Sequence, residues 1–209
     1  RAIAPVLEGA RLEHVEIRDA RLVRPFEPVI VAAELVGERV AEVGRRGKYL
    51  IVGFDSGRSL VVHLRMTGSL RSAARGGLAV DPHTRAILSL DNGSDVAYRD
   101  VRRFGTWELF ENGDVRPYLE ARLGPEPLGP LSAARLGRRV EGRRAPLKSA
   151  LLDQRTIAGL GNIYVDEALW ISHLHPLRDA GSLDRTGARD RRGVPSGECS
   201  TRTRRSCRG

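Results

Sequence analysis

A seven-residue segment, residues 124–130, divides the sequence into two parts that must fold differently. It reads Gly-Pro-Glu-Pro-Leu-Gly-Pro, with three prolines and two glycines. Proline lacks a backbone donor and has a fixed φ, so this segment can lie neither inside a helix nor in a central strand. We therefore predict a linker at residues 123–130, a first domain at residues 1–122 and a second domain at residues 131–177.

The part before the linker contains short runs of apolar and β-branched residues separated by turn signals. The Asn92-Gly93 pair is typical of a tight hairpin, because these residues accept the backbone angles that such a turn requires. The runs lie at residues 29–31, 39–43, 48–54, 59–64, 86–90, 95–98 and 106–110. Several short strands joined by turns indicate a β-sandwich or a flattened barrel.

The part after the linker has helical patterns instead. Ser132 can cap a helix that runs to Val140. Pro146 can begin a second helix, and residues 163–170 form a third after a glycine-bearing turn. The predicted fold class is therefore α+β with two domains. Residues 178–209 are rich in arginine, glycine and serine and lack apolar periodicity, so we predict that they are a disordered tail.

The charge balance favours a polyanionic partner but does not identify one. The formal net charge is +9, which promotes association with nucleic acid by counterion release. Residues 178–209 alone hold nine arginines against four acidic residues, so an argument for DNA must rest on motifs. Only Lys48 and Lys148 among the 35 basic residues are lysines, and a lysine amine can take part in proton transfer where arginine cannot.

Cofactor and location are constrained by two further features. Cys199 and Cys207 are too few for a four-thiolate zinc site, so we expect these 209 residues to bind no cofactor. No apolar run is long enough to cross a bilayer, and residues 1–6 do not have the pattern of a signal peptide. We therefore expect a cytoplasmic protein without a membrane partner.

Four segments, read together, resemble the formamidopyrimidine-DNA glycosylase family. They are residues 44–50 (GRRGKYL), 63–70 (HLRMTGSL), 100–105 (DVRRFG) and 159–164 (GLGNIY), and residues 123–128 (LGPEPL) and 175–176 (HP) fit the same order. Each segment is weak alone, but their order and spacing extend over most of the chain. The resemblance implies an N-terminal β-sandwich followed by a helix–two-turns–helix domain. It also implies a monomer that binds double-stranded damaged DNA between the two domains.

The family is one of base-excision repair enzymes, and the resemblance implies its chemistry. These enzymes remove oxidised purines, such as 8-oxoguanine and formamidopyrimidines, and then cut the backbone at the abasic site through a Schiff base. The damaged base must leave the stack and the gap must be filled. By resemblance Met66, Arg102 and Phe104 form the wedge that fills it, with Arg102 against the orphaned base. The alternative for Met66 and Phe104 is an ordinary place in the core.

The remaining site residues also come from the resemblance. His83, Lys148 and Asn162 are expected to bind phosphate, although Asn162 could instead cap a helix. Lys48 matches the lysine associated with elimination and with the lesion's phosphate, and a plain phosphate contact is its alternative role. His63 lies on a predicted strand, so we expect a packed histidine and not a ligand.

The family's nucleophile is the amine of an N-terminal proline, which is well suited to attack because its pKa lies near 8. The printed sequence starts Arg1-Ala2-Ile3-Ala4-Pro5, and an internal Pro5 has no free amine. Residues 178–209 also lack the two Cys-x2-Cys pairs of the family's zinc finger. We therefore expect these 209 residues to be inactive as a glycosylase and lyase.

Three other functions remain open from the sequence. A non-catalytic protein that binds damaged DNA would need only the wedge and the phosphate contacts. A glycosylase of the endonuclease VIII branch would act on pyrimidines, although Met66, Arg102 and Phe104 resemble the purine branch more closely. A basic β-sandwich that binds RNA is disfavoured, because only 5% of the residues are aromatic and single strands are bound largely by stacking.

Overall fold

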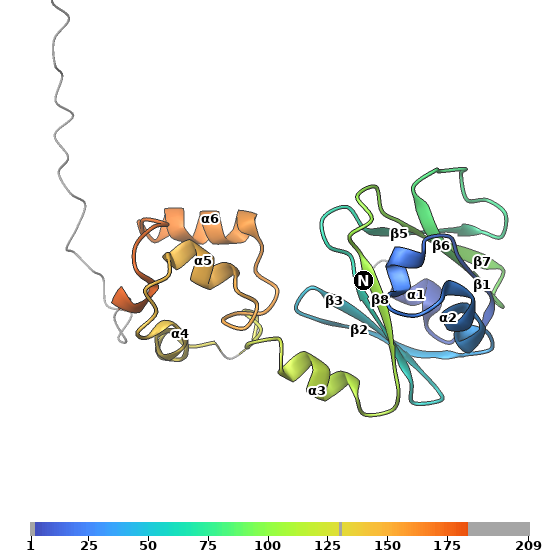
Figure 1. Ribbon diagram of the computed structural model, residues 1–209, viewed down its shortest axis with the longest axis horizontal. Helices are drawn as coiled ribbons and strands as arrows, with labels where there is room; N and C mark the ends of the chain where they lie inside the picture. The colour runs from blue at the N-terminus through green and yellow to red at the C-terminus, as the bar shows by residue number, and fades with distance from the viewer. Residues whose placement is uncertain (1–2, 130, 184–209) are drawn as a thin grey trace, which may run out of the picture.

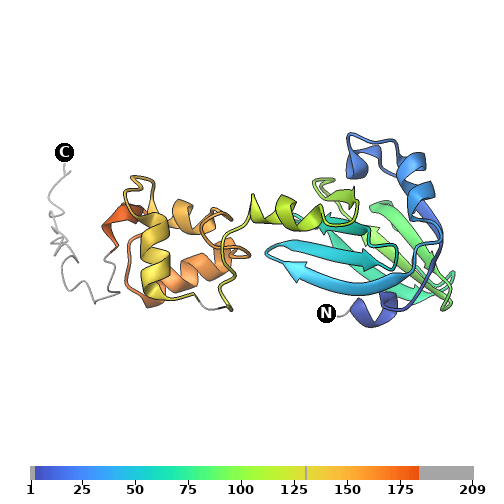
Figure 2. The same ribbon diagram turned by 90° about the horizontal axis from the view of Figure 1, so that it is seen from below.

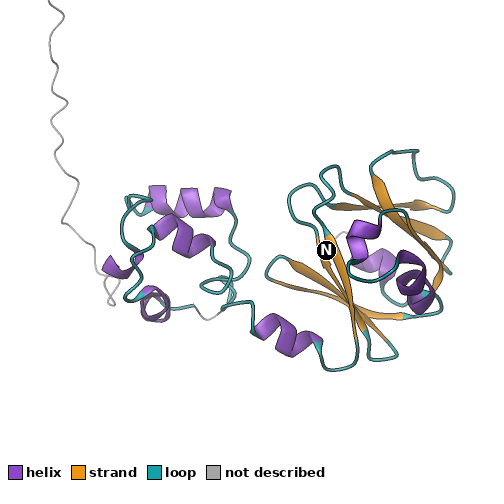
Figure 3. Cartoon of the chain, in the orientation of Figure 1, coloured by secondary structure: helices purple, strands orange, loops and turns teal. Residues whose placement is uncertain are grey.

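Two four-stranded sheets form the larger of two lobes in the computed structural model, which describes residues 3–129 and 131–183. Helix α3 (Val115–Glu120) lies between this lobe and a smaller helical lobe (Figures 1 and 2). The long strands lie in the first lobe, and α4, α5 and α6 lie in the second (Figure 3). The predicted α+β architecture, a β-sandwich followed by a helical domain, is therefore confirmed.

Every strand pairing within the two sheets is antiparallel. The first sheet has the order β1 (Leu12–Ile17), β6 (Thr84–Leu90), β7 (Ser94–Arg99) and β5 (Ser69–Ala74), and the second has the order β2 (Val40–Arg46), β3 (Tyr49–Phe54), β4 (Ser59–His63) and β8 (Thr106–Phe110). The predicted hairpin at Asn92-Gly93 joins β6 to β7, with a φ of +78° at Gly93. This angle favours glycine because the residue has no side chain to clash.

The core of the first lobe lies between the two sheets. Strand β6 alternates buried and half-buried residues along its whole length, which is the pattern of a strand with one face inward. Tyr98 and Trp107 come from opposite sheets and meet edge to face, with their ring centroids 5.6 Å apart. Short helices at Ala4–Leu7 (α1) and Ala20–Val23 (a 3-10 helix) contribute Leu7, Leu22 and Val23 to the same core.

The strand predicted at residues 29–31 is wrong, because these residues lie in helix α2 (Pro28–Leu35). Their β-branched side chains favour a strand locally. Pro28 at the first turn and the helix-favouring residues that follow it allow a helix instead. That helix buries Val31 and Leu35, one turn apart, in the core, so packing decided against the local preference.

Two strands, β1 and β5, were not predicted from the sequence. Strand β5 has the sequence Ser-Leu-Arg-Ser-Ala-Ala, whose small and polar residues have little strand preference. It forms because six of its residues pair in unbroken register with β7. Strands β4 and β5 belong to different sheets, so Met66 lies in a loop that crosses from one sheet to the other.

The helical lobe contains α4 (Ala133–Val140), α5 (Leu147–Leu152) and α6 (Asn162–Ile171). Ser132 caps α4 as predicted, because its hydroxyl accepts the Arg135 N–H at 3.2 Å. The boundary predicted after residue 177 is wrong. Ala180 is fully buried in this lobe's core, within a 3-10 helix at Ala180–Ser182. The rest of the predicted tail, residues 184–209, lies outside the described residues.

The linker is a packed joint between the lobes and not a loose tether. The Gly124 N–H donates to the Gln154 carbonyl at 2.8 Å, and the Ala158 N–H donates to the Pro125 carbonyl at 2.9 Å. On the other side, Glu126 accepts the Gly47 N–H from the β2–β3 turn. Leu119, Leu123 and Ala158 form a small apolar cluster there, packed against Tyr49 and Ile51 of β3. The joint therefore fixes the β2–β3 turn, which carries Lys48, against the helical lobe.

Candidate nucleic-acid interface

The three predicted wedge residues lie together on the surface of the first lobe. Met66 is 73% exposed and Phe104 is 52% exposed, so neither belongs to the core. A guanidinium nitrogen of Arg102 lies 3.0 Å from the sulfur of Met66. The same guanidinium lies over the Phe104 ring, 4.7 Å from its centroid. Two loops far apart in the sequence thus present one exposed group of mixed apolar and cationic character.

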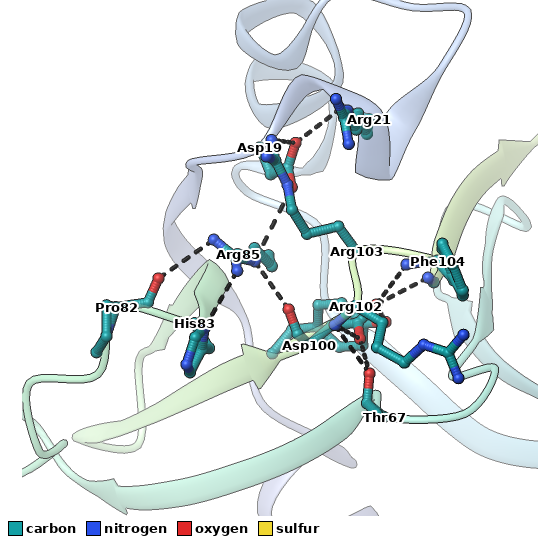
Figure 4. A network of polar contacts seen from close by, with 12 residues as sticks. Asp19, Arg21, Thr67, Pro82, His83, Arg85, Asp100, Arg102, Arg103 and Phe104 are labelled. Atoms are coloured by element: carbon teal, nitrogen blue, oxygen red, sulfur yellow. Dashed lines mark hydrogen bonds and ion pairs between the residues drawn. The ribbon is translucent and has the colours of Figure 1, made fainter.

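Asp100 organises this group from below, and sequence analysis missed it. Its carboxylate is 1% exposed and accepts the backbone N–H groups of Arg102, Phe104 and Gly105 at 3.2, 2.9 and 2.8 Å. It also accepts the Thr67 hydroxyl, which belongs to the Met66 loop (Figure 4). Burial alone would raise the pKa of the Asp100 carboxyl, but these hydrogen bonds hold it below its usual value. One buried anion therefore ties both loops together.

A second buried carboxylate, Asp19, holds the neighbouring arginine. Asp19 receives Arg103 at 2.6 and 2.8 Å, and the Arg21 N–H at 3.1 Å (Figure 4). The Arg103 hydrogen bonds, more than any other cause, lower the pKa of the Asp19 carboxyl. Such fork-shaped pairs fix orientation as well as charge. Asp19 thus connects the 3-10 helix at Ala20–Val23 to the loop that carries Arg102 and Phe104.

Lys48 lies beside a pocket of about 520 Å³, which we call the Lys48 pocket. Its lining residues are Ile3, Arg45, Lys48, Tyr49, Leu50, His63, Leu64, Arg65, Leu70 and Ser72. This volume lies within the range of small-molecule sites. Burial lowers the pKa of the Lys48 ammonium. Within residues 3–129 and 131–183 no carboxylate forms an ion pair with Lys48, so its amine is open to a ligand.

His63 also lines this pocket, although the sequence predicted only a packed histidine. Its ring is largely buried and meets Tyr49 edge to face, with ring centroids 4.7 Å apart. Its Nδ1 accepts the Arg65 N–H at 3.0 Å. A neutral ring that accepts at Nδ1 carries its proton on Nε2, which can then donate to an anion. Lys48 and His63 are far apart in the sequence, and the pairing of Tyr49 with His63 is what brings the histidine next to the lysine.

His63 should make the stability of the protein depend on pH. Burial, with Arg65 and Lys48 nearby, lowers the pKa of His63 from 6.5 to about 4. The unfolded chain therefore binds a proton that the folded chain excludes. Stability from this residue is complete above pH 6.5 and is lost as the pH falls towards 4, by roughly 3 kcal/mol in all. Urea unfolding at pH 7, 6, 5 and 4.5 would measure this loss.

The His63→Asn variant is the control for that experiment, because its amide oxygen can replace Nδ1 as the acceptor of the Arg65 N–H. We expect its unfolding free energy to change much less between pH 7 and 4.5. Asp19 and Asp100 do not contribute to the change in stability between pH 7 and 4.5. Their pKa values are lowered, so the stability they provide is lost only in stronger acid. An equal slope in both proteins would show that His63 is not the group that titrates.

The predicted phosphate ligand His83 lies apart from the Lys48 pocket. Its Nδ1 accepts a guanidinium N–H of Arg85 at 3.4 Å (Figure 4). Its backbone N–H donates to Asp81 at 2.8 Å. Arg85 in turn donates to the Asp100 carbonyl at 2.9 Å. His83 therefore lies next to the Asp100 network, and its contact with phosphate stays a prediction.

Lys148 and Asn162 lie in the helical lobe. Asn162 is the first residue of α6, while Gly161 is the residue that caps the helix, so Asn162 does not act as the cap and its side chain is exposed. Lys148 forms an ion pair with Asp166 on α6, with its nitrogen 2.7 Å from the carboxylate. Asp166 follows Asn162 by one helical turn, so both predicted ligands lie at α6. Phosphate binding by either residue stays a prediction.

Residues 3–129 and 131–183 contain no group of three or more His, Cys, Asp or Glu side chains that could hold a metal ion. Cys199 and Cys207 lie outside the described residues. None of the described helices has the length and apolar character needed to cross a membrane.

Two family models match the chain, one in each lobe. The formamidopyrimidine-DNA glycosylase N-terminal domain matches residues 1–107, and the formamidopyrimidine-DNA glycosylase H2TH domain matches residues 123–189. The unmatched residues between them contain α3. The match over residues 178–183 agrees with their packing into the helical lobe.

Relatives and solved structures give the same result. The formamidopyrimidine-DNA glycosylase of Rhizobium etli is 42% identical over 205 residues, which cover 90% of this chain and 69% of the relative. That of Methylobacterium radiotolerans is 42% identical over 203 residues, covering 90% and 68%. The Lactococcus lactis protein bound to FAPY-dG-containing DNA has a TM-score of 0.82 and 32% identity, over 90% of this chain and 70% of its own. The complex of the Lactococcus lactis protein with abasic-site DNA has the same TM-score and identity, over 90% of this chain and 69% of its own.

Proposed function

This chain belongs to the formamidopyrimidine-DNA glycosylase family, and we propose that it recognises oxidised purines in double-stranded DNA and supports their excision. The observation that carries the proposal is the exposed group of Met66, Arg102 and Phe104, held in place by one buried carboxylate. An exposed apolar and cationic group of this kind suits insertion into a base stack, where apolar side chains act as wedges. The guanidinium of Arg102 can then hydrogen-bond the unpaired base edge.

The Lys48 pocket is the place we propose for the extrahelical nucleotide. Lys48 and the Nε2–H of His63 would bind a phosphate of the lesion strand. Burial lowers the pKa of Lys48 and so favours its neutral amine, which is the form that would accept a proton at the sugar during elimination. In the lyase reaction a proton leaves C2′ of the abasic sugar, the C2′–C3′ double bond forms, and the C3′–O3′ bond breaks with the 3′ phosphate as the leaving group.

A binding experiment tests the proposal on the chain itself. A duplex with a tetrahydrofuran abasic analogue has already lost the stacking of one base, so opening it takes less free energy than opening an undamaged duplex. We expect at least about tenfold tighter binding to the abasic duplex, which corresponds to about 1.4 kcal/mol. Fluorescence anisotropy with both duplexes would measure this preference.

The double variant Met66→Ala/Phe104→Ala should lose most of the preference while it still binds DNA, because the wedge and not the charge is removed. Both side chains are more than half exposed, so the variant should fold normally. Equal affinity of the unchanged protein for the two duplexes would contradict the proposal.

Excision assays distinguish the remaining functions. Release of 8-oxoguanine would support the purine branch, and release of oxidised pyrimidines would support an endonuclease VIII-like activity. Lesion binding without release would support a non-catalytic binder. That these 209 residues form no covalent adduct stays a prediction, which borohydride trapping on an 8-oxoguanine duplex tests. That they bind no zinc also stays a prediction, which metal analysis of the purified chain tests.

A further inference from the structure

A second pocket beside the wedge is lined largely by arginines, and we call it the arginine pocket. Its volume is about 510 Å³, and its lining residues are Arg21, Arg24, Arg65, Met66, Arg103, Phe104, Gly105 and Thr106. The four arginines come from three segments of the sequence. Two of the three wedge residues, Met66 and Phe104, also line it.

Most of the charge in this pocket is not neutralised by the protein. Arg103 is paired with Asp19 at 2.6 Å. Among the residues that the structure describes, no carboxylate forms an ion pair with Arg21, Arg24 or Arg65. Three unpaired guanidiniums around one concave surface create a strongly positive potential, which attracts an anion. Guanidinium groups are also well shaped for the oxygens of a phosphate.

The backbone positions of two arginines indicate that their placement matters. Arg65 has a φ of +53° and Arg103 has a φ of +59°, a region that residues with side chains rarely adopt. Such strain persists only where the surroundings hold it, and it concentrates at functional sites. For Arg103 the restraint is visible, because Asp19 and the Asp100 network hold the loop on both sides.

The position of the pocket indicates which phosphate it receives. The arginine pocket and the Lys48 pocket share Arg65 and no other lining residue, so the Arg65-Met66 segment separates them. A wedge that enters a duplex has one strand on each side. If the lesion strand lies at the Lys48 pocket, the other strand passes the arginine pocket.

We propose that the arginine pocket binds a phosphodiester of the strand opposite the lesion, with Arg21 and Arg24 as its main contacts. This inference rests on the proposed function, because it needs the wedge to enter the duplex. The pocket then holds the undamaged strand while the Lys48 pocket takes the extrahelical nucleotide. The two arginines extend the DNA contact beyond the wedge to a surface supplied by the segment at residues 20–24.

Salt-dependent binding of the Arg21→Gln/Arg24→Gln variant to the abasic duplex tests the proposal. Each phosphate contact adds about one unit to the slope of log affinity against log salt. We expect the variant to have a slope shallower by about one unit, because both arginines contact the same phosphodiester. The Arg21→Lys/Arg24→Lys variant keeps the charge and should keep the slope. Circular dichroism confirms folding of both variants, and an unchanged slope in the glutamine variant would overturn the proposal.

Methylphosphonate linkages, which carry no charge, identify the strand. Placed near the site opposite the lesion, they should reduce the slope of the unchanged protein but not that of the glutamine variant. The same linkages in the lesion strand should reduce both. If only lesion-strand linkages abolish the difference between the two proteins, the pocket binds the lesion strand and the proposal is wrong.

A matched variant separates this outcome from a failure of the proposed function. Arg135 and Arg138 are exposed on α4 in the other lobe, and neither guanidinium has a hydrogen-bond or ion-pair partner among the described residues. The Arg135→Gln/Arg138→Gln variant removes the same charge, and its slope should respond to methylphosphonates opposite the lesion as that of the unchanged protein does. Loss of the abasic preference in the unchanged protein would contradict the proposed function. An intact preference with no effect of Arg21 and Arg24 would contradict only this inference.

Discussion

The Asp100→Ala variant is expected to lose about 3 kcal/mol of its free energy of unfolding and nearly all of its preference for abasic DNA. Asp100 accepts the backbone N–H groups of three wedge-loop residues, Arg102, Phe104 and Gly105. Without the carboxylate the Phe104 and Gly105 N–H groups lose their acceptor, and the Arg102 N–H keeps only the Thr67 hydroxyl, at 3.1 Å. A buried donor left unsatisfied costs more than the bond itself contributed. The loop should then leave its observed conformation.

The effect on binding follows from what the loop carries. Arg102 and Phe104 lie on it, and the Thr67 hydroxyl connects it through Asp100 to the loop of Met66. If the loop moves, the three wedge side chains no longer lie together, although each is still present. The expected result is an abasic preference close to that of the Met66→Ala/Phe104→Ala variant. Urea unfolding and anisotropy on the same preparations would measure both effects.

Asp95 provides the matched control. It lies near the start of β7, whose last residue precedes Asp100, and it is also buried. Its carboxylate accepts the Gly76 N–H at 2.8 Å and makes no contact with the wedge loops. The Asp95→Ala variant should also lose stability, but it should keep its preference for abasic DNA. If both variants lose the preference equally, the effect is one of general stability, and Asp100 has no specific role in the wedge.

The sequence predicted the parts of the fold that depend on local chemistry. The hairpin at Asn92-Gly93 and the helix capped by Ser132 form where their turn and cap residues lie. Residues 29–31 and strand β5 were missed, because a tertiary contact decides each of them: burial of Val31 for the helix and pairing with β7 for the strand. Local preference is a weak guide where packing opposes it.

The residues of the candidate site also fall into two groups, those that sequence motifs identify and those that only the folded chain brings together. Met66, Arg102 and Phe104 could be named because they lie in short motifs that resemble the family. Asp100 lies in one of those motifs, but only the folded chain shows three backbone donors converging on its carboxylate. The arginine pocket is drawn from separate segments, so no spacing in the sequence reveals it. Contacts between distant segments are what the sequence alone does not provide.

The Gly124→Ala variant is expected to have a comparably large effect through the joint between the lobes. A Cβ added at Gly124 would lie 2.4 Å from the Arg155 carbonyl oxygen and 2.8 Å from that of Thr156. Both are backbone atoms, so the joint must shift as a whole, at a cost of about 2–3 kcal/mol. The shift would also disturb the hydrogen bond from Arg46 to the Gly124 carbonyl, which is 2.8 Å long.

Gly129 is the control within the same linker. A Cβ there would meet its nearest atom, the Glu126 carbonyl oxygen, at an ordinary 3.4 Å, and neither glycine has a positive φ. Gly129→Ala should therefore change stability by less than about 0.5 kcal/mol. Urea unfolding compares the two variants directly, since they differ only in what the added methyl group meets.

Binding should separate the same two variants. Arg46 precedes the turn that carries Lys48, so a displaced joint moves Lys48 relative to Asn162 and Lys148 in the helical lobe. Small displacements of groups that must bind one ligand together greatly reduce its binding. The affinity for the abasic duplex should therefore fall by about tenfold or more in Gly124→Ala and not in Gly129→Ala. If DNA contacts both lobes at once, its affinity must change when the joint between them shifts. Equal affinities of the two alanine variants would therefore show that each lobe binds DNA independently of the joint.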